Sequence, residues 1–166
     1  MSNFSANAAA ALVSVAVLVL ILYRQLQVRA VTTTLTVPAI LVAAGLANLA
    51  GTSQGMPLTT HSLASLAILL AVDAVGLGAV RAYTVSLWNE GGAWYRQGTW
   101  LTACLWLVGT GMHVAVDAAM GFGAGSALLY LGVTYAAQRL VVQHRVAVLV
   151  GNRTRRIAPD GPTRRP

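Results

Sequence analysis

Asp73 is the position where the sequence points most directly to chemistry, because it lies near the middle of an apolar run over residues 62–82. An ionised carboxylate in hydrocarbon costs several kcal/mol, so Asp73 is expected to face protein or water. Ala74 and Gly78 form a small-xxx-small pair on neighbouring turns, which lets another helix approach closely. Two roles stay open for Asp73: a hydrogen-bonded carboxyl that helps helices to pack, and a group on a proton or ion pathway.

His113 and Asp117 are four residues apart in another apolar run, which places them on one face of a helix. At that spacing the imidazole can donate a hydrogen bond to the carboxylate. The pair suits a proton relay, half of a metal site or a plain hydrogen bond at a helix end. A metal needs more than two ligands, and His61 in another loop is the third side chain that could join.

Arg139 lies about one turn from the end of the last apolar run. Its long side chain can extend to a membrane surface, or can meet Asp73 if the two helices are neighbours. Asn48, Thr110 and Gln138 are suited to hydrogen bonds between helices. These side chains indicate a packed helical bundle and do not by themselves indicate catalysis.

Sequence motifs of common enzyme classes are absent. The chain has no lysine for a Walker phosphate loop, and it contains no HExxH, G-x-S-x-G or G-x-G-x-x-G motif. Its single cysteine, Cys104, excludes an internal disulfide and a CxxC redox pair. We therefore expect no catalytic site, no cofactor site and no metal site, and we expect that the protein is not an enzyme.

The elements that position these residues are predicted from hydrophobic length. Of the 166 residues, 57% are hydrophobic and only 9% are charged, against roughly one quarter charged in a typical soluble domain. Several apolar runs approach the roughly 20 residues that span a bilayer. The sequence predicts an all-α membrane protein, a bundle of about five transmembrane helices with spans near residues 8–23, 31–50, 62–82, 99–117 and 125–143.

The positions of the arginines predict an orientation. All 11 basic residues are arginine, and none precedes Arg24, which argues against a cleaved signal peptide. Cytoplasmic loops of membrane proteins carry an excess of basic residues. The sequence thus predicts a multi-pass protein of a bacterial cytoplasmic membrane, with the N-terminus outside and the C-terminus in the cytoplasm. In this arrangement every arginine is cytoplasmic.

A short cytoplasmic β-hairpin is predicted between the third and fourth helices. Two aromatic and β-branched stretches within residues 82–97 flank the turn-forming residues 89–92. The tryptophans here and at Trp100 suit the headgroup depth of a membrane. The same hairpin supplies a candidate interaction surface, formed by Trp88, Glu90, Trp94, Tyr95 and Arg96.

Residues 152–166 are predicted to be a disordered cytoplasmic tail, because arginines alternate there with proline and glycine. The tail can contact anionic lipid headgroups, each arginine contributing about 1 kcal/mol near the surface, or it can act in topology alone. The net charge of +7 does not indicate nucleic-acid binding, since the arginines lie at the edges of apolar runs and in this tail.

The chain resembles the CcdC-like family of small bacterial integral membrane proteins of unknown function. The resemblance extends over most of residues 10–118 and implies the fold rather than a reaction. Where family members often carry an arginine in the fourth helix, this chain has His113. The features that carry the resemblance are the loop Arg24-Gln-Leu-Gln-Val-Arg29, Pro38 in the second helix, Arg81 at the end of the third, the hairpin, and Gly98-Thr99 before the fourth.

Two functions follow as expectations. The first is a non-enzymatic accessory or interaction component of a bacterial membrane complex, which contacts a membrane or cytoplasmic protein through the hairpin and the tail. The second is a small transporter or a proton- or ion-conducting subunit that uses Asp73 at the middle of the bilayer. His113 with Asp117 and Arg139 are the further polar residues that this second function would employ.

Overall fold

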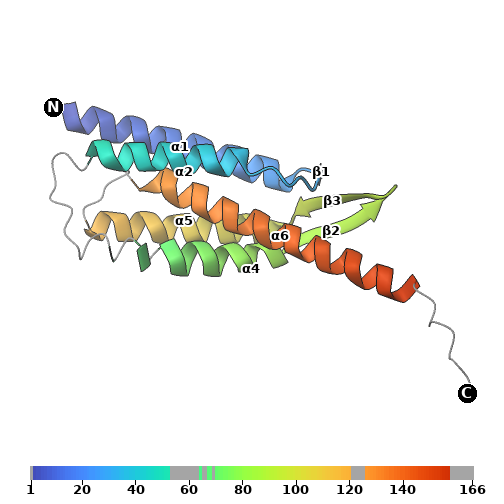
Figure 1. The fold of residues 1–166 in the computed structure, drawn as a ribbon. Helices are drawn as coiled ribbons and strands as arrows, with labels where there is room; N and C mark the ends of the chain where they lie inside the picture. The colour runs from blue at the N-terminus through green and yellow to red at the C-terminus, as the bar shows by residue number, and fades with distance from the viewer. Residues whose placement is uncertain (1, 53–63, 65–66, 69, 121–125, 158–166) are drawn as a thin grey trace, which may run out of the picture.

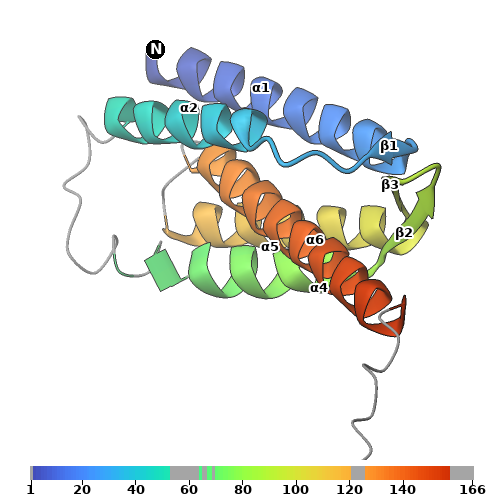
Figure 2. The same cartoon turned by 45° about the vertical axis from the view of Figure 1, so that its right-hand side comes forward.

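The helices form two layers, and the longest helix crosses between them (Figure 1, Figure 2). The computed structural model describes residues 2–52, 64, 67–68, 70–120 and 126–157. One layer holds the first two helices and the other holds α4 and α5, while α6 packs against α1, α2, α4 and α5. The bounds are α1 (Ser2–Leu26), α2 (Thr36–Thr52), α4 (Gly78–Tyr83), α5 (Trp100–Met120) and α6 (Ala127–Ile157).

A π-helix precedes α4 without a break. This segment, η2 (Leu70–Leu77), contains the backbone of Asp73, and single π-helical turns often occur at functional positions. The side chain of Asp73 lies outside the part of the chain that the structure describes. In α2, Pro38 is the third residue, where its missing N–H removes no hydrogen bond within the helix.

α2 and α6 cross with their backbones in close contact. A Cβ added at Gly45 would collide with the backbone of Leu129, and one added at Gly132 would lie 2.7 Å from the backbone nitrogen of Val42. Beside this crossing, aromatic and aliphatic side chains form the buried core. Its fully or almost fully buried members are Ile21, Trp106, Tyr130, Leu131 and Tyr135.

A three-stranded antiparallel sheet extends from one end of the bundle, with strand order β1-β3-β2. Its hairpin joins β2 (Val85–Glu90) to β3 (Ala93–Gly98) through Gly91 and Gly92. Both glycines have positive φ, 58° and 85°, as a two-residue turn with the twist of a hairpin requires. The predicted hairpin is therefore present, and β1 (Arg29–Ala30) adds a third strand that the sequence did not predict.

The prediction of about five transmembrane helices is wrong. Among the described residues, one segment, Trp100–Ala119, is long and apolar enough to cross a membrane. The apolar helices Leu12–Leu26 and Thr36–Gly51 are shorter; α2, with 17 residues, is only about 25 Å long, less than the roughly 30 Å of a hydrocarbon core. The third predicted span is divided between η2 and α4, and α6 includes the polar residues Gln138, Arg139 and Gln143.

The boundaries of the predicted elements also differ from the structure. The last helix was expected to end near residue 143, yet α6 continues to Ile157, which is about 46 Å for its 31 residues. Residues 152–157, predicted as the start of a disordered tail, are thus helical. The remainder of the tail, residues 158–166, lies outside the described residues.

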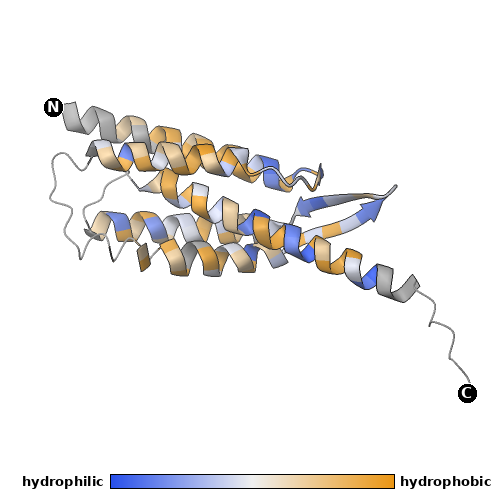
Figure 3. Cartoon of the chain, viewed as in Figure 1, coloured by the Kyte–Doolittle hydropathy of each residue, from blue (hydrophilic) through white to orange (hydrophobic). Residues whose placement is uncertain are grey.

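Many large apolar side chains on the helices are exposed, and hydrophobic residues occur along all the helices in Figure 3. They occur on every long helix, and polar residues concentrate instead on the hairpin and on the C-terminal half of α6 (Figure 3). A contiguous apolar exterior is unusual for a soluble monomer and is typical of a surface that contacts lipid or another protein. Examples are Leu12, Val19, Ile40, Ile68, Val72, Leu101, Val108 and Met112, each more than half exposed.

Candidate functional site

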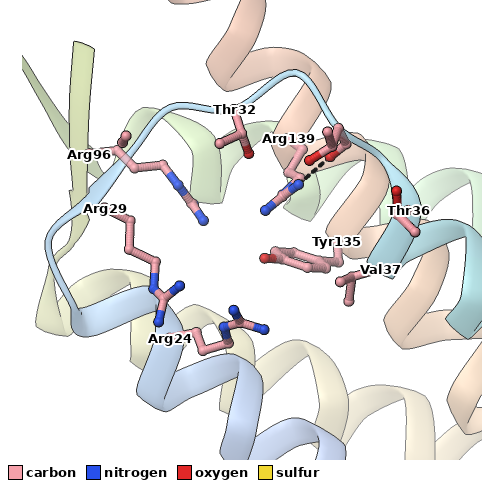
Figure 4. A pocket seen from close by; sticks show the side chains of 10 residues that line it. Arg24, Arg29, Thr32, Thr36, Val37, Arg96, Tyr135 and Arg139 are labelled. Atoms are coloured by element: carbon pink, nitrogen blue, oxygen red, sulfur yellow. Dashed lines mark hydrogen bonds between the residues drawn. The ribbon is translucent and has the colours of Figure 1, made fainter. Parts of the chain in front are cut away.

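A cavity of about 380 Å³ opens where the bundle meets the sheet. Its walls come from the end of α1, the extended segment 29–34, the first turn of α2, β3 and α6 (Figure 4). The lining contains four arginines, three threonines and a tyrosine, and no acidic residue. We call it the arginine pocket; it is lined by Arg24, Arg29, Ala30, Thr32, Thr34, Thr36, Val37, Arg96, Tyr135 and Arg139.

Strand pairing brings two of these arginines together. Arg29 in β1 is the register partner of Arg96 in β3, and both side chains extend into the pocket from the sheet end (Figure 4). Arg24 reaches it from the last turn of α1, and Arg139 reaches it from α6 on the opposite side (Figure 4). Three regions that are far apart in sequence therefore place four like charges around one cavity.

The hydrogen bonds of Arg29, Arg96 and Arg139 to the protein use only some of the N–H donors of each guanidinium. Arg96 Nη1 donates to Gln25 Oε1 at 3.1 Å, and Arg29 Nη2 donates to Gln27 Oε1 at 2.9 Å. Arg29 Nε is buried and has no partner among the described residues. Arg139 Nη1 donates to the Thr34 carbonyl, with its guanidinium 5.1 Å from the centre of the Tyr135 ring. Each contact leaves further N–H donors, since a guanidinium carries five.

The electrostatics of the arginine pocket are those of an unneutralised cationic site. Burial lowers the pKa of the Arg96 guanidinium, and the nearby positive charges of Arg139 and Arg29 act in the same direction, while Tyr135 opposes them. Like charges at such separations repel even where solvent screens them. No carboxylate lines the pocket to offset that repulsion, so an anion bound between the arginines would offset it.

From Arg96, hydrogen bonds continue into the core of the bundle. Gln25 Nε2 donates to Gln138 Oε1 at 2.8 Å, and the Trp106 indole N–H donates to the same oxygen at 3.2 Å. All three side chains are buried. Gln138 Nε2 has no partner among the described residues. The Gln25 amide is bonded at both ends, to Arg96 and to Gln138, and such buried bonds fix rotamers, so Gln25 holds Arg96 at the wall of the pocket.

Arg81 lies beyond Trp106 and is fully buried. Its guanidinium stacks 4.5 Å from the Trp106 ring centre, its Nε donates to the Leu105 carbonyl at 3.1 Å, and its Nη2 donates to Tyr130 Oη at 3.1 Å. The absence of a side chain at Gly109 makes room for it, because a Cβ there would collide with Nη2. Arg81 was predicted at the cytoplasmic end of the third helix, and the structure buries its side chain inside the bundle.

His113, Ser126 and Asp117 form a buried cluster at the far end of this row of polar side chains. His113 stacks on Tyr130 with ring centres 4.1 Å apart, and its Nε2 lies 3.0 Å from Ser126 Oγ and 3.4 Å from Asp117 Oδ2. Ser126 Oγ donates to Asp117 Oδ2. His113 and Asp117 thus share one helix face, as predicted, and Ser126 is a partner that the prediction omitted.

This cluster does not have the arrangement of a hydrolytic triad. A catalytic triad requires the carboxylate on one imidazole nitrogen and the hydroxyl on the other, whereas here Ser126 and Asp117 both approach Nε2. His113 Nδ1 and Asp117 Oδ1 are buried without partners among the described residues. The described residues also contain no group of three or more His, Cys, Asp or Glu side chains that could hold a metal ion, and His61 lies outside them.

The hairpin residues that were predicted as an interaction surface divide between two environments. Trp88 and Tyr95 are half-buried and stack on each other, with ring centres 6.1 Å apart. Glu90 is exposed, Trp94 is half-buried, and Arg96 is buried at the arginine pocket. Arg96 therefore belongs to the pocket and not to an outward-facing surface.

Sequence reasoning missed the arginine pocket because it assigned these arginines to topology. One signal was present: Arg24 and Arg29 are followed by three successive threonines at 32–34, a group of donors within one short segment. Arg139 was predicted to reach the membrane surface or Asp73, and the structure places it in the pocket. No motif links Arg96 and Arg139 to the first loop, because only the tertiary fold joins them.

Comparison with known proteins gave no relatives. No protein-family model, no curated protein and no solved structure matches this chain.

Proposed function

We propose that this protein is a non-enzymatic membrane component that binds a phosphate-type anion in the arginine pocket. The observation that carries the proposal is the convergence of Arg24, Arg29, Arg96 and Arg139 on one cavity that no acidic side chain lines. Arginine forms paired, charge-assisted hydrogen bonds with phosphate oxygens, which makes it the common choice for phosphate recognition. Threonine hydroxyls in the lining add further donors.

Membrane association is supported by the apolar exterior of the helices and by the apolar segment Trp100–Ala119. The polar hairpin and the arginines at the sheet end suit the cytoplasmic side of a bacterial membrane. In this proposal the pocket binds the anion without changing it chemically. The hairpin is the surface through which the protein, as an accessory component, contacts a partner protein.

Isothermal titration calorimetry of the full chain in detergent micelles tests this function, with inorganic pyrophosphate as the probe. We expect saturable binding by the native protein and a Kd at least about tenfold higher for the double variant Arg24→Gln, Arg29→Gln, since hydrogen bonds to charged groups are worth about 1.5–3 kcal/mol each. Arg153→Gln is the matched control, because Arg153 lies on the exposed end of α6. No binding by the native protein, or equal Kd values in all three proteins, contradicts the proposal.

A second candidate function is a proton- or ion-conducting subunit, and one observation favours it. The buried row from Gln25 through Arg81 to His113 and Asp117 places polar and ionisable groups along the inside of the bundle. Intramembrane ionisable residues commonly mark ion or proton pathways. The sequence prediction assigned this role to Asp73, and Asp117 is the second carboxylate to examine.

Proton flux into liposomes separates the two functions. If the protein conducts, Asp117→Asn and Asp73→Asn should each lower the flux at least about tenfold, while the anion-site variant Arg24→Gln leaves it unchanged. Absence of flux in the native protein, or full flux in both carboxylate variants, eliminates conduction through these residues.

A further inference from the structure

We infer that the occupant of the arginine pocket is the phosphomonoester headgroup of a membrane lipid, with an acyl chain lying along the exposed face of α2. This inference rests on the proposed anion binding and adds the ligand class. It joins two features of the molecule that meet at Val37, namely a cationic cavity and an apolar stripe on a helix.

The charge of the arginine pocket favours a doubly charged headgroup. Four guanidiniums surround the cavity and no carboxylate lines it. A phosphomonoester carries about −1.5 to −2 charge near neutral pH and has three acceptor oxygens, whereas a phosphodiester carries a single charge. Arg24 extends into the cavity without a hydrogen bond to any described residue, and Arg29 Nε is buried and unpartnered. These free donors match the additional oxygen and charge of a terminal phosphate.

The apolar stripe begins in the pocket wall. Val37 lines the cavity and is also 41% exposed, and Ile40 on the next turn is 61% exposed. Ala44 and Ala47 continue the exposed stripe along α2 at helical spacing. From Val37 to Ala47 the helix rises about 15 Å, which is about half of a hydrocarbon core of roughly 30 Å. The stripe therefore has the length of one acyl chain in one leaflet.

Exposed apolar residues also lie on α1 next to Arg24, which lines the pocket. Tyr23 and Leu20 on α1 are 62% and 53% exposed, on the turns beside and before Arg24. The end of α1 and the first turn of α2 both line the pocket. A soluble anion would make no use of these apolar flanks, whereas a lipid places its phosphate among the arginines and its chain along the helices.

The experiment compares one headgroup with and without acyl chains. The full-length protein in detergent micelles is titrated with phosphatidic acid, with glycerol 3-phosphate, which lacks the chains, and with phosphatidylglycerol, which is a phosphodiester. We expect phosphatidic acid to bind at least about tenfold more tightly than either of the other two. Native mass spectrometry of the protein with phosphatidic acid should show one bound lipid.

Two variants locate the headgroup and the chain separately. Arg24→Gln should weaken the binding of phosphatidic acid and of glycerol 3-phosphate alike. Ile40→Asn should weaken only the binding of phosphatidic acid, because it changes the exposed stripe and leaves the pocket intact. Retained glycerol 3-phosphate binding by Ile40→Asn shows that this variant is folded. Val80→Asn, at a half-exposed position of α4, is the control and should bind both ligands as the native protein does.

The outcomes distinguish failure of this inference from failure of anion binding. If glycerol 3-phosphate binds as tightly as phosphatidic acid, the site takes a soluble phosphate and the lipid inference is wrong. If phosphatidylglycerol equals phosphatidic acid, the preference for a phosphomonoester is wrong. If phosphatidic acid does not bind and cross-linking shows a dimer with Ile40 in its interface, a second copy of the chain covers the stripe and the lipid inference is wrong. If no phosphate compound binds, the proposed function itself fails.

Discussion

Arg29 lies directly opposite Arg96 in the antiparallel pairing of β1 with β3, and both side chains line the same cavity. Like charges at opposed positions of a sheet destabilise the pairing. The two opposed arginines therefore lower the stability of the ligand-free protein. Such a loss of stability is common at functional sites, and it fits the anion binding that we propose for this pocket. The free and the ligand-bound protein should therefore respond in opposite ways to removal of one charge.

Arg29→Gln is expected to raise the stability of the ligand-free protein by about 0.5 kcal/mol, because it removes one of the two opposed charges. With saturating pyrophosphate the same variant should be less stable than the native protein, because it gains less from the ligand. Thermal unfolding in detergent with and without pyrophosphate measures both effects. Arg153→Gln should show neither, and a lower Tm of ligand-free Arg29→Gln would count against the electrostatic account.

Gly109→Ala should destabilise the protein by about 1–3 kcal/mol, since the new methyl group overpacks the space that holds Arg81 and the hydroxyl of Tyr130. Gly111→Ala is a close control: it lies on the same helix, and a Cβ there meets nothing within 4 Å. The substitution at Gly111 is expected to be neutral or slightly stabilising, because alanine favours a helix. Equal Tm values for the two variants would show that Arg81 is not packed against Gly109.

Gln25→Leu is expected to lower both stability and anion affinity. It leaves Arg96 Nη1 without its amide partner, and it removes the hydrogen bond that Gln25 donates to Gln138 Oε1. An unsatisfied buried polar group costs about 1–3 kcal/mol of stability. Gln97→Leu is the control, because it removes only an exposed hydrogen bond to the Leu26 carbonyl. The readout is the Kd for pyrophosphate at a temperature where both variants are folded. An unchanged Kd in Gln25→Leu would show that Arg96 needs no positioning.

Replacement of Trp88 and Trp94 together by alanine is expected to remove any protein partner that co-purifies with the native chain. These half-buried rings lie on the hairpin, which extends from one end of the bundle, and aromatic rings dominate the energy of protein interfaces. Trp100→Ala is the control, as Trp100 is exposed on α5 outside the hairpin. Affinity purification followed by mass spectrometry gives the answer, and a partner retained by the double variant must bind elsewhere.

The sequence was sufficient for features that depend on short stretches of chain. The hairpin follows from residues 82–97, because its turn glycines and its aromatic and β-branched flanks are contiguous. The pairing of His113 with Asp117 follows from their spacing on one helix. Both relationships are local: side chains alternate between two faces every second residue in a strand, and they return to the same helix face about every 3.6 residues.

Features that depend on tertiary structure could not be predicted in this way. The count of five spans relied on apolar length and on the placement of the arginines. Neither shows that Arg81 is buried or that the third apolar run is divided between η2 and α4. The arginine pocket depends on β1, a two-residue strand with no sequence signal of its own. Ser126 escaped notice because its partner Asp117 belongs to a different element, α5, and no helical spacing connects the two residues.

The crossing of α2 and α6 determines where the chain can accept sequence variation. Gly45 and Gly132 each face the backbone of the other helix. Backbone atoms cannot rotate away, so a larger residue at either position must push the helices apart. Much of the apolar exterior can exchange one aliphatic residue for another without such a shift. In a saturation-mutagenesis library these two glycines should therefore be among the least tolerant positions, although neither lines the arginine pocket.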